Sequence, residues 1–365
     1  MGGAIASPAS LALIVSSFPE GSGRNRAMGL YAGIASGGAS LGLVLGGLIT
    51  QWASWRWVFF INVPVGIAVA ACAPAFLRET PRQRGSFDFT GALTSVTGMA
   101  ALVYTFIRAA TAGWSDVTTL AALAVALVAL AVFLAAETQA AQPVTPLRLF
   151  ADTQRSASYV ARLLLVGGMF GMFFFATQFL QLVLGFSPLR AGAAFLPMTL
   201  LLFAVSRLAA RVLGRVRAAP MMVAGLVLVI TGMAWLSGLS AATGYFPGIL
   251  GPMLLFGTGV GLAFVPLTTV SLAGVAPQDA GAASSMVNAA QQVGGALGLA
   301  VLITVFGTAT RAAAHDPQPG LSRLAQAHDI LVHGMAAAFW VATIFDACAL
   351  LVIVGAAAAA RRPGG

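Results

Sequence analysis

The sequence predicts an all-α membrane protein with many spanning helices, and its composition and apolar runs carry this prediction. Hydrophobic residues make up 59% of the 365 residues, charged residues only 8%, and the mean hydropathy is +0.92. A soluble domain has about a quarter charged residues. Lipid-embedded backbones have to form helices or closed barrels, and the apolar runs are much longer than the ~10-residue alternating strands of a barrel.

The spans are predicted from apolar length, because a helix needs about 20 apolar residues to cross a bilayer. About eleven transmembrane helices are expected, of which the first is short and begins almost at Met1. The candidate spans are 3–18, 28–50, 57–77, 88–108, 117–136, 157–184, 190–206, 218–238, 246–270, 280–306 and 333–356.

The arginines predict how these helices are oriented. If 18–27 is cytoplasmic, alternation places 78–87, 137–156, 207–217, 271–279 and the C-terminus on the same side. These segments hold 13 arginines and the opposite side holds 5, with Arg162, near a helix start, left out of the count. Cytoplasmic loops carry such an excess. The arginines behind the formal charge of +9 are therefore interpreted as determinants of membrane orientation. They predict a multi-pass cell-membrane protein that lies in the lipid bilayer and does not bind nucleic acid.

The same orientation places Met1 outside the cell, ahead of a short apolar run. No basic segment precedes this run, so it does not fit a secretory signal peptide. An odd number of upstream helices would turn span 3–18 in the right direction. The charge count thus favours a chain whose first helices are missing.

Two neighbouring features near the start form a motif. Within span 28–50, Gly38, Gly42 and Gly46 recur every four residues and Gly47 follows, a spacing that lets another backbone approach closely. The spacing alone also fits ordinary helix packing. A string of aromatic and polar residues suited to the membrane interface comes next. The signature residues of this string are Trp55, Arg56, Trp57, Asn62 and Pro64.

Together these features resemble a signature of the 14-helix drug:proton antiporter branch of the major facilitator superfamily. Further similar strings occur in the family's order at 146–150, 185–192, 257–261, 279–284 and 292–295. The resemblance extends over essentially the whole chain. It implies a major facilitator-type bundle in which 1–77 is a remnant of the N-terminal half, corresponding to family helices 4–6. Residues 78–156 would be the linker helix pair with the central cytoplasmic segment, and 157–365 the C-terminal six-helix half.

One position departs from the family pattern. The antiporter motif of the fifth family helix usually has a Gly-Pro pair, where this sequence has Gly42-Leu43. Proline fixes φ and removes a backbone N–H, so a weaker kink is expected here. This departure bears on the proton coupling that the resemblance implies for this helix.

Amide and aromatic side chains are the predicted substrate lining. Gln178 and Gln181 are three residues apart on one face of span 157–184, and Phe174 and Phe175 lie beside them. The resemblance implies that this span and span 280–306 line the cavity. Such a lining suits large, partly apolar ligands, and the alternative is hydrogen bonding between helices. The candidates are Phe174, Gln178, Gln181, Asn288, Gln291 and Gln292.

Asp346 is the acidic candidate for a proton or cation, because it lies near the middle of the last apolar run and intramembrane acids are functional candidates by default. The alternative is a structural role, since the resemblance makes this helix peripheral. Asp88 and Asp279 stand at helix starts and are expected to act as N-caps. Cys72 and Cys348 are expected to be small buried apolar residues.

Other patterns favour packing over chemistry. The glycine-rich 257–261 lies inside an apolar run rather than between a strand and a helix, so it is not predicted to bind phosphate. His315, His328 and His333 are expected in or beside a long external loop at 307–332. The sequence has no HExxH motif, nucleophile elbow or paired carboxylates on one helix face, and no enzyme, metal or cofactor is predicted.

The resemblance implies an exporter of lipophilic, often cationic, drugs or antibiotics in exchange for protons. Two other interpretations stay open at this point. One is a truncated chain that transports nothing. The other is a carrier of a single substrate on the same fold, because a fold does not fix function.

Overall fold

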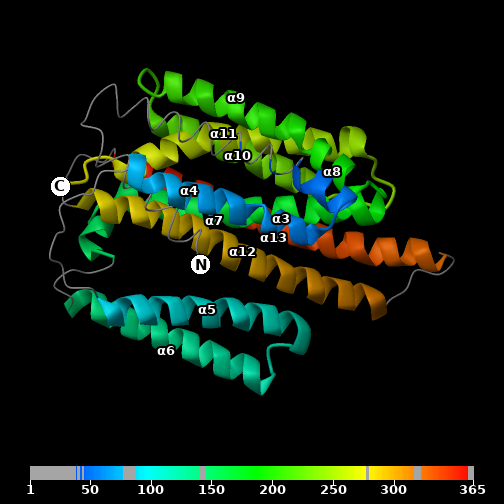
Figure 1. Cartoon of the computed structure of the whole chain (residues 1–365), viewed down its shortest axis with the longest axis horizontal. Coiled ribbons are helices and arrows are strands. Elements are labelled where there is room, and N and C mark those ends of the chain that lie inside the picture. The colour runs from blue at the N-terminus through cyan, green and yellow to red at the C-terminus, as the bar shows by residue number, and fades with distance from the viewer. Residues whose placement is uncertain are drawn as a thin grey trace.

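The computed structural model describes residues 38, 42, 45–76, 88–139, 145–276, 279–315 and 322–360. In this part of the chain the regular elements are helices, with no strand (Figure 1). Nine helices among the described residues are long and apolar enough to cross a bilayer, and they match nine predicted spans one for one. Span 3–18 and most of span 28–50 lie outside the described residues. The all-α membrane fold is confirmed.

The described helices run in chain order from α3 to α13. α3 and α4 form one apolar run, η1 precedes the long α7, and π-helical turns (η2, η3) adjoin α7 and α11. Their bounds are α3 Trp55–Phe60, α4 Asn62–Phe76, α5 Phe89–Ala112, α6 Val117–Gln139, η1 Leu147–Ala151, α7 Thr153–Gln178, η2 Phe179–Val183, α8 Pro188–Ala194, α9 Leu196–Val212, α10 Ala218–Leu236, η3 Tyr245–Ile249, α11 Leu250–Leu272, α12 Ala280–His315 and α13 Arg323–Ala359.

The centre of the bundle is α7, which packs against α11, α12 and α13. Phe175 on α7 is fully buried, and its ring centroid lies 5.3 Å from that of Phe306 on α12 and 6.1 Å from that of Phe339 on α13. The antiparallel α5–α6 pair lies outside α12, where Thr304 Oγ1 donates to the carbonyl of Phe106 at 2.7 Å. Because α7 contacts all three of these helices, a movement of one of them can be passed to the others through α7.

Glycines let the C-terminal helices approach closely. A Cβ on Gly259 of α11 would lie 2.5 Å from the carbonyl oxygen of Gly225 on α10, and one on Gly257 would lie 2.7 Å from that of Met198 on α9. Added side chains at these places would separate the helices. The predicted packing role of the glycine-rich segment 257–261 is thus confirmed.

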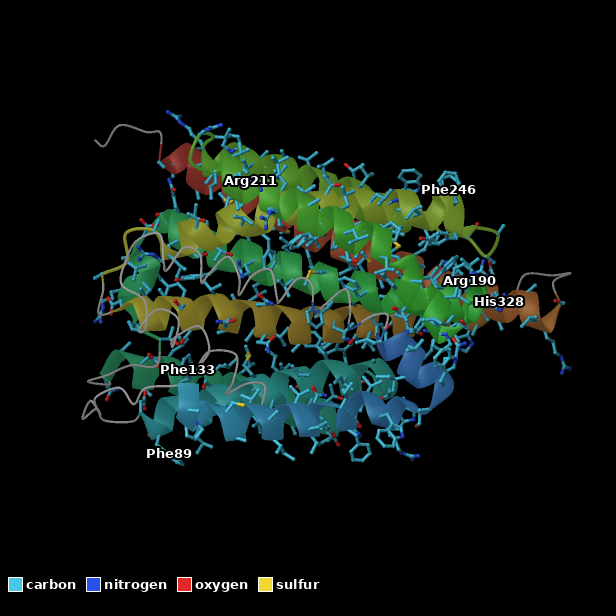
Figure 2. All side chains as sticks on the ribbon, turned by 45° about the horizontal axis from the view of Figure 1, so that its top comes forward. Phe89, Phe133, Arg190, Arg211, Phe246 and His328 are labelled. Carbon is cyan, nitrogen blue, oxygen red and sulfur yellow. The ribbon has the colours of Figure 1, made fainter. Side chains whose placement is uncertain are left out.

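The connections between helices gather at two ends of the bundle. The α9–α10 turn, the end of α11, the starts of α7 and α12 and the end of α13 lie at one end, and the end of α12 and the start of α13 lie at the other (Figure 1). Figure 2 shows Arg211 at the first end, and Arg190 and His328 at the second. This arrangement agrees with the predicted alternation. Which end faces the cytoplasm stays a prediction.

Two sequence predictions are wrong, namely the long loop at 307–332 and the burial of the two cysteines. The expected long loop 307–332 is largely helix, because α12 continues to His315 and α13 begins at Arg323. The alanine-rich segments on either side of the connection are good helix formers and continue the helices beyond the apolar run. His315 and His328, expected in the loop, therefore lie on α12 and α13, and His333, expected at the end of the loop, lies within α13.

Cys72 and Cys348 are free and exposed, not buried. In a membrane bundle the surrounding lipid is itself apolar, so a small apolar side chain does not have to point inward.

Candidate functional site

The signature string at 55–64 builds a helix start and a helix junction. Ser54 caps α3 by accepting from the backbone N–H of Arg56 at 3.3 Å, and the Arg56 guanidinium lies 5.4 Å from the Trp55 ring centroid. Asn62 Nδ2 donates to the carbonyls of Val58 and Phe59, both at 3.2 Å. Trp57 and Pro64 are exposed. These contacts join residues close in sequence, so they indicate a structural role for the string at the α3–α4 boundary.

The glycine-rich face makes one close contact. A Cβ on Gly47 would lie 2.6 Å from the carbonyl oxygen of Pro188 at the start of α8, so backbone approach is confirmed there. At Gly38, Gly42 and Gly46 an added Cβ would meet nothing within 4 Å. Of the described glycines in this helix, Gly47 alone fits the expected approach.

A buried arginine connects α7, α11 and α12. The side chain of Arg162 donates through Nη1 to Gln291 Oε1 on α12 at 3.3 Å and through Nη2 to Thr268 Oγ1 on α11. Its guanidinium carbon lies 4.3 Å from the ring centroid of Phe264, also on α11. Arg162 is only 2% exposed. Three helices therefore meet around one cation within the bundle.

The three polar residues predicted to line a cavity on α12 differ in whether they contact Arg162. Gln291 is half-buried and faces Arg162, whereas Gln292 is exposed. Asn288 is half-buried and its Nδ2 donates to the carbonyl of Ser284 at 3.2 Å within its own helix. Of the three α12 residues predicted to line a cavity, the structure brings Gln291 into the buried polar cluster.

The predicted polar pair on α7 spans a change of helix type. Gln178 is the last residue of α7, while Gln181 lies in the π-helical turn η2, whose wider turn removes the i, i+3 alignment of an α-helix. Both glutamines are half-buried. Phe174 is 38% exposed and packs edge-on against Phe175 at 5.1 Å. Phe174 is thus on the surface, and Phe175 is part of the core.

The acidic candidate Asp346 lies inside the bundle, where α13 packs against α7. It is fully buried, and within the described part of the chain neither carboxylate oxygen has a hydrogen-bond partner. A Cβ on Gly168 of α7 would lie 3.1 Å from Asp346 Oδ2, so the carboxyl group packs against bare backbone. A hollow of about 220 Å³ lies next to this contact, and Gly167 and Phe345 are among its apolar lining residues.

Asp88 and Asp279 stand at helix starts, and the structure separates their roles. Asp88 accepts from the N–H of Gly91 at 2.8 Å, which confirms the predicted N-cap of α5. Asp279 directly precedes α12 and forms a two-pronged ion pair with Arg148 of η1, at 2.8 Å and 2.5 Å. Its N-cap role stays a prediction. Hydrogen bonding from Arg148 lowers the pKa of Asp279.

Arg162 is the functional candidate that the sequence alone does not single out. Its signal is an arginine inside an apolar run, but a span drawn from residue 157 places it near the helix start. In the structure Asp152 caps α7 by accepting from the N–H of Arg155 at 2.7 Å, and α7 begins at Thr153. Arg162 therefore lies deeper in the helix than the apolar run indicates.

Long apolar helices with charged side chains buried between them define a polytopic α-helical membrane protein. The chain belongs to the Major Facilitator Superfamily, whose family model matches residues 1–299.

Similar proteins carry names that refer to antibiotics. The chain is 38% identical over 338 residues to the puromycin resistance protein of Streptomyces alboniger, covering 90% of this chain and 65% of that protein. It is 36% identical over 314 residues to the cephamycin export protein of Amycolatopsis lactamdurans, covering 85% and 65%. It is 34% identical over 303 residues to the tetracenomycin C resistance and export protein of Streptomyces glaucescens, covering 82% and 56%. The chain thus spans 56% to 65% of the length of these relatives.

Proposed function

We propose that this protein exports lipophilic drugs or antibiotics across the cell membrane in exchange for protons, with its C-terminus in the cytoplasm. Membership in the superfamily and the similarity to antibiotic resistance and export proteins support the export of small molecules. The arrangement of arginine-rich connections at one end of the bundle supports the orientation.

The observation that carries the exchange with protons is the burial of Asp346. Its carboxyl group is fully buried, has no hydrogen-bond partner in the described part of the chain, and rests on Gly168 near the middle of α7. Such a group changes its charge when water reaches it and when water leaves, because an unpaired buried charge is unfavourable. Rocking of two halves about a central site would expose it alternately.

The substrate side of the proposal uses the amide and aromatic residues around α7 and α12. Gln291 is held against Arg162, and the half-buried Gln178, Gln181 and Asn288 belong to the same two helices and the adjoining turn η2. The exposed Phe174 and Gln292 would contact a ligand at the bundle surface. Few directional bonds and much apolar area suit lipophilic ligands.

The test is a flux assay in proteoliposomes with ethidium as the probe and an imposed pH step. The proposal predicts that the pH step drives ethidium uphill, and that Asp346→Asn abolishes this while downhill ethidium exchange persists. Asp329→Asn is the matched control, because Asp329 lies on the same helix nearer its N-terminus. Flux that ignores the pH step would contradict proton exchange, and absence of any flux would favour the non-transporting alternative.

A further inference from the structure

The buried cation Arg162 has no counter-ion among the described residues. The ion pairs in this part of the chain are Arg108–Asp116 and Arg148–Asp279, and neither involves Arg162. Its two hydrogen-bond partners, Thr268 and Gln291, are neutral. The centre where α7, α11 and α12 meet therefore keeps a net positive charge.

The position of Arg162 makes this charge costly. It lies nine residues after Thr153, which places it about 14 Å along the helix axis from the start of α7. Arginines near membrane interfaces extend toward water, but this guanidinium is buried and lies against Phe264 on α11. A buried charge without an opposite partner is strongly unfavourable, so an anion at this place would relieve that cost.

The guanidinium also has unused donors. It carries five N–H groups, and the two hydrogen bonds leave three of them open, including Nε, which is buried without a partner in the described part of the chain. Phe264 lies against the guanidinium, with its ring centroid 4.3 Å from the guanidinium carbon, and contributes no hydrogen-bond acceptor. The edge of a guanidinium matches a carboxylate in a two-pronged arrangement.

The surroundings give such a ligand an approach. Phe264, Thr268 and Gln291 are half-buried rather than sealed in the core, and the neighbouring Gln292 is exposed. The site is therefore close to the surface on the α11–α12 side. The polar rim and the aromatic ring suit a compound that combines an acidic group with an apolar body.

We propose that Arg162, with Thr268 and Gln291, binds the carboxylate of the transported compound. The substrates would then include amphiphilic acids and zwitterions, in addition to the cations that the family resemblance implies. This inference rests on the proposed export function for its physiological meaning, but binding itself can be measured without transport.

The test compares two dyes that differ in one charge, rhodamine B with a free carboxylate and its ethyl ester without one. Binding to the purified full chain in detergent is followed by fluorescence anisotropy. The wild type is expected to bind the acid more tightly, and Arg162→Gln is expected to weaken binding of the acid about tenfold or more while binding of the ester stays unchanged. Arg162→Lys keeps the charge but not the two-pronged geometry, so an intermediate loss is expected.

Arg190→Gln is the matched control. Arg190 also lies over a phenylalanine ring, Phe186, with its guanidinium carbon 4.0 Å from the ring centroid, but it is exposed at the other end of the bundle. This variant should leave both dyes unaffected. Equal weakening of both dyes by Arg162→Gln would show a purely structural role and overturn the inference. Wild-type binding of the ester as tight as that of the acid would also overturn it.

A second measurement covers the case in which the Arg162 variants do not fold. Benzoate should raise the thermal unfolding midpoint of the wild type, whereas neutral benzamide should not, and equal effects of the two would refute the site. The outcomes also separate the two proposals. A preference for the acid without any ethidium flux would leave the site intact and reject export, and pH-driven ethidium flux without the preference would support export and reject the site.

Discussion

The contact between α10 and α11 yields a prediction whose size follows from the structure. A Cβ on Gly259 would lie 2.5 Å from the carbonyl oxygen of Gly225, whereas ordinary contact begins at 3.4 Å, so the helices would have to separate locally by the difference, about 0.9 Å. Overpacking of this kind costs about 1–3 kcal/mol. Gly259→Ala should therefore lower the thermal unfolding midpoint by about 1 to 4 °C.

The contact is reciprocal, which sharpens the test. A Cβ on Gly225 would lie 2.6 Å from the carbonyl oxygen of Gly259, so one displacement of the helices accommodates both changes. The double variant Gly225→Ala/Gly259→Ala should lose less stability than the sum of the single variants, because neighbouring sites are not independent. The assay is thermal unfolding of the purified protein in detergent, followed by intrinsic tryptophan fluorescence.

Gly355→Ala on α13 is the matched control, because an added Cβ there meets nothing within 4 Å. Alanine is favoured over glycine within helices by about 0.5–1 kcal/mol, so this variant should be unchanged or slightly more stable. The packing argument would be refuted if Gly259→Ala unfolded at the wild-type midpoint, or if the two single effects simply added.

Three further predictions follow from the charged and polar groups. Because Arg148 lowers the pKa of Asp279, their ion pair should stabilise the protein above the ordinary aspartate pKa of 3.8, and this contribution should be lost as the pH falls through the lowered pKa. Asp279→Asn should remove this part of the pH dependence of the unfolding midpoint, and an unchanged pH profile in this variant would contradict the prediction. Gln178→Ala or Gln181→Ala should reduce drug resistance in a susceptible host at equal expression, and unchanged resistance would reject these residues as substrate lining. Asp346→Asn should make the remaining export in whole cells insensitive to a protonophore, and a retained response would place the proton elsewhere.

The fold is predictable from the sequence because the membrane imposes a simple rule on apolar length. The ends of the helices are harder to predict from the sequence. Apolarity stops at the lipid boundary, while the alanine-rich segments before His315 and after Arg323 continue as helix. In the same way, the cap formed by Asp152 starts α7 earlier than the apolar run does.

The site is harder to predict because its contacts join residues distant in sequence. Arg162 meets Thr268 and Gln291 through tertiary packing, and no local pattern reveals that arrangement. Asp279 follows a local N-cap pattern, but its ion pair with Arg148 joins residues 131 positions apart and has no local signal. Asp346 can be found because an acid in an apolar run is conspicuous, whereas its position against Gly168 depends on how α13 packs on α7.

The orientation of the bundle is the claim on which export direction depends, and site-directed thiol labelling tests it most directly. With Cys72 and Cys348 replaced by serine, single cysteines are introduced at Arg211 and Phe246, which lie at opposite ends of the bundle (Figure 2). A membrane-impermeant maleimide should label Phe246→Cys in intact cells, and Arg211→Cys only after the membrane is permeabilised. Labelling of Arg211→Cys from outside, with Phe246→Cys protected, would contradict the account.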